Sequence, residues 1–293
     1  MSYLRVRAHL SIRPFEEKDI GFAYEMTVRE QWNVSRADIK RMFNYEPNGC
    51  FIAEAKGSRV AHVFTVNYGS LGWIGLLIVE AEYREKGIAT LLMKKAIDYL
   101  LHSGVETIKL EAVPEIADLY RKLGFVDEYD SLRFMGKSRK TIPLQSDSTI
   151  HMQKEKIEEI AKFDAAYFGA GRTTVLMSLC QENPNLCFAS YKDSKIVGYL
   201  MCRRAEEGYN VGPFVCEPEE SRTARDLLAR CMRELGSETS VYLGVPAVNE
   251  GTVEILREFG FEQYSKSIRM RLGKNLRNER PSGVFAIGGA MKG

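Results

Sequence analysis

The sequence lacks several features that would assign a protein to a class at once. Its 293 residues contain no run of about 18 apolar residues, and the N-terminus has no apolar stretch typical of a secretory signal. The six cysteines form no C-x-x-C pair, and the four histidines show no metal-ligand spacing. We therefore expect reduced thiols, no metal, no membrane span and a cytoplasmic location.

An excess of charge of one sign is also missing. Lys and Arg number 41 against 39 Asp and Glu, which gives a net charge of +2. Because nucleic-acid-binding domains cluster an excess of basic residues, no nucleic-acid partner is expected. The chain does have 45% hydrophobic residues and enough length for two domains with separate cores.

The stretch from Leu76 to Leu101 joins an apolar strand to an amphipathic helix. The run Leu76-Leu77-Ile78-Val79 is short and rich in branched residues, which predicts a buried strand. A wide apolar face then predicts a helix from about Gly87 to His102. This strand, loop and helix are the part of the chain on which a functional prediction can be based.

The loop between them has the composition of an anion-binding site. The first N–H groups of a helix have no partner within the helix, and the dipole is positive at that end. Gly87 and Ala89 let a ligand approach the backbone, while Arg84 and Lys86 add positive charge. The loop predicts phosphate or pyrophosphate binding, although Glu85 adds a negative charge. A solvated turn carrying two cations is the alternative.

The spacing of Val79, Arg84, Gly87 and Ala89 fits V-x-x-x-x-[RQ]-x-x-G-x-[GA] and resembles the pyrophosphate loop of the GNAT N-acetyltransferases. The resemblance implies acetyl-CoA as the acyl donor. It also implies that backbone groups of the strand hold the pantetheine arm and that the loop holds the pyrophosphate. The cofactor-binding residues so implied are Leu77, Ile78, Val79, Arg84, Glu85, Lys86, Gly87, Ile88, Ala89 and Thr90.

A second motif, A-x-L-Y-x-x-L-G-F from Ala117 to Phe125, resembles the tyrosine helix of the same family. The resemblance implies that Tyr120 is a general acid that protonates the departing thiolate. A phenol of pKa about 10 suits a thiolate of pKa about 8.5. Spacing alone would instead favour Tyr120 as a core residue. The family often has asparagine where Pro114 stands.

The two halves of the chain are related. Ile52-Ala53 matches Phe188-Ala189, and Leu91-Leu92 matches Leu227-Leu228, each 136 residues further along. Strands and helices alternate, and with the resemblance this predicts an α/β (α+β) class. Tandem GNAT folds are expected, each a mixed, mostly antiparallel central sheet flanked by helices. We predict a catalytic domain at 1–137, a polar linker at 138–148 and a degenerate GNAT-like domain at 149–293.

The second copy lacks the chemistry of the first. Its loop, Cys216 to Ala224, has three glutamates and no glycine, and Leu256 stands where the first copy has Tyr120. Further motifs resemble the YitH-like two-domain GNATs: Glu30-x-Trp32-Asn33, Val113-Pro114, Gly212-Pro213, Val245-Pro246, Asn249, Gly260-Phe261 and the glycine-rich Val284 to Gly289.

The acceptor is predicted from fewer signals. The family reaction is direct attack of a neutral amine on the thioester, and Glu30, Trp32 and Asn33 are predicted to contact a small-molecule amine. Glu30 is also a candidate base, with Glu111 and His62 as further options. The amine itself, the acyl-chain length and the oligomeric state have no signal in the sequence.

Three functions stay open at this point. The first is an N-acetyltransferase for a small molecule, and the second is a non-catalytic module that senses acyl-CoA or binds a protein. The third is acetylation of peptide N-termini, which places a smaller demand on the base. Arg172 is expected to pair with Asp164, or alternatively to clamp a substrate carboxylate, and the junction of the halves is a candidate wall of the substrate pocket.

Overall fold

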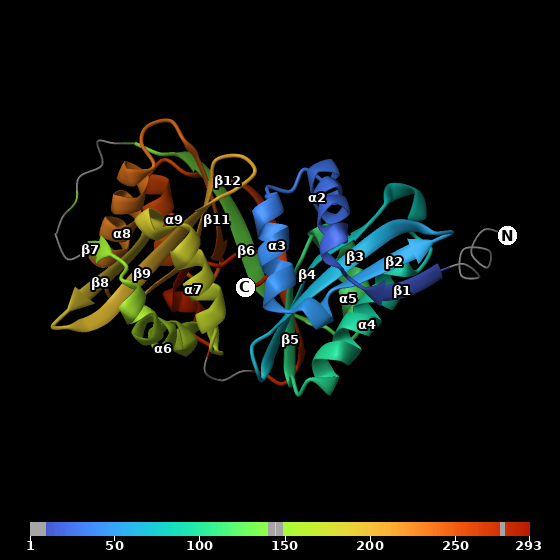
Figure 1. Cartoon of the computed structure of the whole chain (residues 1–293). Coiled ribbons are helices and arrows are strands. Elements are labelled where there is room, and N and C mark those ends of the chain that lie inside the picture. Colours follow the sequence, from blue (N-terminus) through green and yellow to red (C-terminus); the bar gives the residue numbers. More distant parts are fainter. Residues whose placement is uncertain (1–9, 140–143, 145–148, 276–278) are drawn as a thin grey trace.

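The computed structural model describes residues 10–139, 144, 149–275 and 279–293. One sheet runs through both halves of the chain, and helices cover its faces (Figure 1). The strands follow the order β1-β2-β3-β4-β5-β12-β6-β11-β10-β9-β8-β7, with β13 paired to β10 off this path. Neighbours are mostly antiparallel, while β4 pairs with β5 and β10 pairs with β11 in parallel. The predicted class, a mixed, mostly antiparallel sheet flanked by helices, is confirmed.

The first half begins with a strand and two helices. Ser35 caps the second of these helices, since its side chain accepts a hydrogen bond from the backbone N–H of Asp38. The elements are β1 (Leu10–Pro14), η1 (Glu17–Asp19), α2 (Ile20–Arg29), α3 (Arg36–Tyr45), η2 (Pro47–Gly49), β2 (Phe51–Ala55), β3 (Ser58–Asn67), β4 (Leu71–Val79), η3 (Ala81–Tyr83), α4 (Ile88–His102), β5 (Thr107–Ala112), η4 (Pro114–Ile116), α5 (Ala117–Arg121) and β6 (Val126–Lys137).

The second half repeats this order, which confirms the internal repeat. Its elements are β7 (Thr149–His151), η5 (Lys154–Lys156), α6 (Ile157–Phe168), α7 (Thr173–Glu182), η6 (Pro184–Leu186), β8 (Cys187–Lys192), β9 (Lys195–Arg204), β10 (Tyr209–Cys216), α8 (Ser221–Glu234), β11 (Ser240–Pro246), α9 (Glu250–Glu258), β12 (Glu262–Gly273), η7 (Pro281–Gly283) and β13 (Val284–Ala286). Most of the predicted linker at 138–148 lies outside the described residues, and the division into 1–137 and 149–293 stays a prediction.

The two halves exchange a strand. β12 lies between β5 and β6, and β6 lies between β12 and β11. Residues 268–273 of β12 pair with β5, and residues 131–137 of β6 pair with β11. The side chains follow the strands, since Met270 packs in the α4 core of the first half and Phe134 packs in the α8 core of the second. Each half therefore needs a strand from the other to complete its sheet.

The core is divided by the sheet into three clusters. One cluster packs α4 against the first half, and another packs α8 against the second. The third lies on the opposite face and includes Phe64 and Trp73 from the first half with Tyr167 and Met201 from the second. Because this cluster is shared, burial of its apolar surface stabilises the contact between the halves as well as each fold.

A buried carboxylate fixes the exchanged strands. The side chain of Glu111 on β5 is fully buried and accepts hydrogen bonds from Ser131 Oγ at 2.9 Å, Ser267 Oγ at 2.5 Å and Arg269 Nε at 2.6 Å. Arg133 Nη2 lies 3.5 Å away. Burial alone would raise the pKa of Glu111, but the charges of Arg269 and Arg133 outweigh it and lower that pKa.

We predict that Glu111→Gln lowers the free energy of unfolding by about 3 kcal/mol, because Arg269 then lacks its closest counter-charge in a buried site. Urea denaturation followed by circular dichroism at neutral pH measures the change. The control is Glu106→Gln, which removes an exposed pair with Lys274 and should cost less than about 0.5 kcal/mol. Equal effects of the two substitutions would contradict a stabilising role for Glu111.

Candidate active site

Two neighbouring strands of the first half separate from each other. β4 and β5 pair only through Leu71–Trp73 and Thr107–Lys109 within the described chain. β4 then continues to Val79 without β5, whose other edge pairs with β12 over its whole length, Thr107 to Ala112. The backbone groups on this side of residues 77–79 therefore face an opening in the sheet. Leu76 has a φ of 50°, and the register with β3 shifts there, which marks a bulge at the point of separation.

The loop after β4 presents the start of α4 to this opening. Gly87 occupies the N-cap position with a φ of 79°, a left-handed conformation that glycine adopts without strain. No side chain caps the helix there. Glu85 also has a positive φ, of 61°. An uncapped helix N-terminus beside a glycine suits an anion.

Both basic side chains of the loop, Arg84 and Lys86, make contacts within the chain. Arg84 Nε donates to the carbonyl oxygen of Val79 at 3.0 Å, and its Nη2 group pairs with the carboxylate of Glu30. Lys86 donates to the carbonyl of Glu82, and its ammonium lies 5.0 Å from the centre of the Tyr83 ring. The structure thus brings Glu30, which the sequence assigns to the acceptor, into contact with a residue assigned to the cofactor.

Tyr120 lies on the short helix α5 in the α4 core, with its ring edge-on to Phe125 at 6.2 Å between centroids. The side chain is 5% exposed, and its hydroxyl has no hydrogen-bond partner among the described residues. Burial raises the pKa of Tyr120 above its ordinary value. The phenol is therefore protonated at neutral pH, as a proton donor must be.

Trp32 and Asn33 lie at the junction of the halves. Trp32 is partly buried and packs against the shared cluster. Asn33 donates from Nδ2 to the carbonyl of Glu207 at 3.0 Å and accepts from the backbone N–H of Glu207 at 2.8 Å. This reciprocal pair holds the end of α2 against the β9–β10 turn, so the side chain of Asn33 has a structural contact where the sequence predicts a substrate contact.

The matching opening in the second half is filled by the chain itself. Within the described residues, β10 and β11 pair only at Tyr209–Asn210 and Val241–Tyr242, and β13 lies beside β10 at Phe214 and Val215. On its other side, Ile287 N donates to the carbonyl of Gly244 in β11 at 2.9 Å. Sequence reasoning missed this strand, because its three residues in a glycine-rich segment carry no strand periodicity.

Asn249 contacts the strand that fills this opening. Its position is close to that of the family asparagine that contacts the cofactor, but here its Nδ2 group donates to the carbonyl of Val284 in β13 at 3.0 Å. The helix start in this half also differs from that of α4. The carboxylate of Glu220 stands at the N-cap of α8 and pairs with Lys192 at 2.6 Å. A negative group therefore occupies the end where an anion would bind.

Comparison with known families agrees with this geometry. Residues 15–125 match the Acetyltransferase (GNAT) family, and residues 160–286 match the Acetyltransferase (GNAT) domain. The chain belongs to the GNAT superfamily. It carries two GNAT domains, as predicted, and this family transfers acetyl groups from acetyl-CoA.

Individual relatives span nearly the whole chain. Holothin acyltransferase of Pseudoalteromonas sp. (strain SANK 73390) is 25% identical over 269 residues, which cover 92% of this chain and 90% of that protein. YitH of Bacillus subtilis (strain 168), named as an uncharacterized N-acetyltransferase, is 23% identical and covers 76% and 75% of the two chains. The crystal structure of a protein from Pyrococcus horikoshii matches with a TM-score of 0.83 at 22% identity, covering 97% and 96%, and shows the same fold.

Two of the base candidates are not placed to act on an acceptor. Glu111 of the first GNAT domain is fully engaged by the arginines and serines described above. His62 on β3 is completely buried between the rings of Phe22 and Phe64, with centroids at 6.2 and 5.6 Å. Neither of its ring nitrogens has a hydrogen-bond partner among the described residues, and burial lowers its pKa to about 4.

Buried ion pairs lie at and beside the contact between the GNAT domains, and the pair of Arg203 and Asp38 crosses it. Arg172 binds Asp164 through two nitrogens, each 2.8 Å from a carboxylate oxygen, which confirms the predicted structural pair. Asp38 of α3 accepts from Arg203 of β9 at 3.0 Å and from Arg41 at 2.6 Å. Burial opposes the charge of Asp38, but Arg203 and Arg41 outweigh it and hold its pKa well below the usual range.

The C-terminal segment runs through this contact (Figure 1). Trp73 Nε1 donates to the carbonyl of Ala290 at 2.9 Å, and the hydroxyl of Tyr68 donates to that of Lys292 at 2.8 Å. The backbone of Met291 packs on β4 at Gly75, where a side chain would collide with it. The junction that the sequence suggests as a wall of the substrate pocket is therefore filled, next to β4, by this segment.

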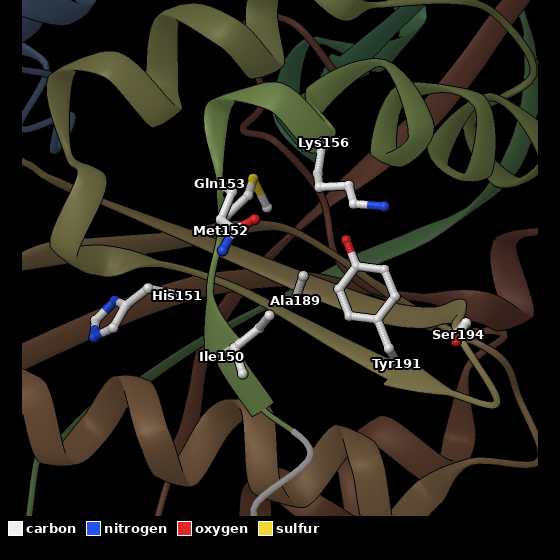
Figure 2. A pocket seen from close by; sticks show the side chains of 8 residues that line it. All are labelled: Ile150, His151, Met152, Gln153, Lys156, Ala189, Tyr191 and Ser194. Atoms are coloured by element: carbon white, nitrogen blue, oxygen red, sulfur yellow. The ribbon is translucent and has the colours of Figure 1, made fainter.

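A hollow of about 330 Å³ lies elsewhere, beside the edge strand β7 of the second GNAT domain (Figure 2). Lys156 and Tyr191 point toward each other across it, with the ammonium 5.9 Å from the ring centre. None of the predicted site residues line it. Its lining residues are Ile150, His151, Met152, Gln153, Lys156, Ala189, Tyr191 and Ser194.

The described residues contain neither a cluster of metal-ligating side chains nor a helix suited to a membrane. No three His, Cys, Asp or Glu side chains in that part of the chain gather closely enough to hold a metal ion. Within the same ranges, no helix has the length and apolar character needed to cross a membrane.

The burial of His62 predicts how the stability of the chain depends on pH. The pKa of His62 is about 4 in the folded chain and about 6.5 when unfolded, so the unfolded state binds the extra proton below about pH 6.5. The contribution of His62 is complete above that pH and falls as the pH drops toward 4. We expect it to fall by about 1 kcal/mol between pH 8 and pH 5.5.

Urea denaturation of the native chain and of His62→Leu at both pH values tests this. The variant should lose less stability than the native chain over that interval. His102→Gln changes an exposed histidine and should behave like the native chain. An unchanged pH dependence in His62→Leu would show that His62 does not titrate with the shifted pKa.

Proposed function

We propose that the chain is an acetyl-CoA-dependent N-acetyltransferase that acetylates the amine of a small molecule. The first GNAT domain carries the reaction, and the second completes its sheet without binding a cofactor. A small-molecule acceptor is supported by the name of the relative from Pseudoalteromonas, an acyltransferase for holothin. The loop and the tyrosine favour this function over a non-catalytic module.

One observation carries the proposal: the open backbone edge of β4 leads directly to an uncapped helix start. In this arrangement Leu77, Ile78 and Val79 align the pantetheine arm through backbone hydrogen bonds. The segment Arg84 to Thr90 holds the pyrophosphate with its N–H groups, because the α4 dipole and Gly87 favour a close anion. The same opening in the second domain contains β13, so only one site is expected.

In the reaction, acetyl-CoA supplies the acetyl thioester. The neutral amine attacks the thioester carbon, the C–N bond forms and the C–S bond breaks. Tyr120 donates its proton to the departing sulfur, and the proton that the nitrogen releases on becoming an amide restores the phenol through solvent. Glu30, Trp32 and Asn33 border the acceptor side, and Glu30 is the member with a carboxylate able to meet a cationic amine.

Calorimetric titration with acetyl-CoA is the experiment that tests the cofactor site. We expect one site per chain and at least about tenfold weaker binding by Gly87→Ala, since a methyl group on this left-handed residue displaces the loop backbone. The control, Gly57→Ala, imposes a similar backbone cost at a φ of 80° in the β2–β3 turn. It should bind like the native chain.

The number of acetyl-CoA sites found by this titration also tests the assignment of the two domains. Two sites per chain would contradict the assignment of the second domain. Absence of binding would overturn the acetyltransferase proposal and leave an interaction module. Binding without coenzyme A release from any amine offered would favour an acyl-CoA sensor.

We predict that Tyr120→Phe lowers kcat by about 100-fold, because general acid catalysis commonly contributes that much, and leaves the acetyl-CoA Kd unchanged. Coenzyme A release with an active amine measures kcat, and calorimetry measures Kd. Tyr99→Phe removes another phenol hydroxyl of the same domain, one bonded to Glu46 at 2.5 Å, and should leave kcat near the native value. Native turnover in Tyr120→Phe would remove this residue from the mechanism.

A further inference from the structure

The ion pair between Glu30 and Arg84 joins two parts of the proposed site. Arg84 reaches back over the end of β4, with Nε on the Val79 carbonyl and Nη2 on the Glu30 carboxylate. Both side chains are partly exposed, Arg84 at 47% and Glu30 at 32%. The pair therefore lies at the surface of the opening, where a ligand from solvent can reach both groups.

Two groups compete for the guanidinium of Arg84, the carboxylate of Glu30 and the pyrophosphate of acetyl-CoA. In the proposed complex it lies beside the pyrophosphate, whose oxygens are strong acceptors for arginine. In the empty chain it is held by Glu30, so a phosphate must compete with that carboxylate. Because an exposed ion pair contributes little to stability, a pyrophosphate that also binds the α4 N-terminus is able to displace it.

Displacement would leave the carboxylate of Glu30 in place. Its backbone N–H donates to the carbonyl of Met26 at 3.1 Å, which anchors it to the last turn of α2. The adjacent Arg29 pairs at 2.6 Å with Glu80, which directly follows β4, and this second pair does not involve Arg84. The end of α2 thus stays beside the strand when the Glu30 pair opens.

We propose that Glu30 exchanges partners during the reaction cycle: it pairs with Arg84 in the empty enzyme and binds the amino group of the acceptor once acetyl-CoA has taken Arg84. This rests on the proposed function and extends it. The released carboxylate attracts the cationic form of the amine to the opening, and the amine loses its extra proton to solvent before it attacks in the neutral form. The acceptor contact forms only after acetyl-CoA has released Glu30 from Arg84.

The first test is a double-mutant cycle in acetyl-CoA affinity, measured by calorimetry on the full chain. Glu30→Gln should tighten acetyl-CoA binding by about two- to fivefold, the range expected when one exposed ion pair no longer has to be broken. In an Arg84→Gln background the same change should have no effect, because the pair is already absent. Glu80→Gln, which removes the neighbouring pair with Arg29, is the matched control and should leave the affinity unchanged.

The second test separates affinity for the two substrates. A panel of primary amines is screened for coenzyme A release, and the amine that the native chain turns over fastest is used for kinetics. Glu30→Gln should raise KM for this amine at least about tenfold at saturating acetyl-CoA, since it loses a charge-assisted contact. Its KM for acetyl-CoA should fall. A merely structural role for Glu30 would weaken both together.

The outcomes distinguish this inference from the function on which it rests. If the native chain binds no acetyl-CoA, the proposed function fails. If the native chain binds and Glu30→Gln binds equally or more weakly, the partner exchange is overturned while the acetyltransferase proposal stands. Tightening that persists in the Arg84→Gln background, or an unchanged KM for the amine, would also overturn the exchange.

Discussion

The structure depends on how the free edge of a separated strand is satisfied. Buried backbone N–H and C=O groups need hydrogen-bond partners, so a sheet that opens must be closed by another element, by water or by a ligand. Both halves open at the same place, after the third residue of the β4–β5 pairing and after the second of the β10–β11 pairing. In the second half β13 enters the opening, and Asn249 binds its backbone. In the first half the edge of β4 stays available, next to a helix start without a cap.

The strand exchange and the C-terminal segment both place residues of the second half against β4. The exchange of β6 and β12 brings Arg269 from the second half over the ring of Trp73 on β4, 4.5 Å from its centre, and onto Glu111. The C-terminal segment packs on the same strand at Gly75. The second half thus contributes packing and charge to the strand that the proposed cofactor would use. This contribution of the second half is structural and requires no reactive residue there.

Much of this architecture is predictable where the signal is local. The helix from about Gly87 to His102 has its periodicity and its glycine start within one segment, and Ser35 caps α3 by a motif four residues long. The repeat places the elements of the second half. The strand exchange is not predictable in this way, because the alternation of β6 fits the edge of either sheet. The pair of Glu30 and Arg84 joins residues 54 positions apart, and no spacing rule connects them.

The exchange of β6 and β12 also has a consequence for the history of the gene. After a duplication, one copy usually can be lost or moved to another protein as a unit. Here a stop codon ahead of residue 262 would remove the strand between β5 and β6, and the first copy would be left with a gap in its own sheet. Selection for the proposed activity of the first copy would therefore also preserve the second. The two copies are inherited as one.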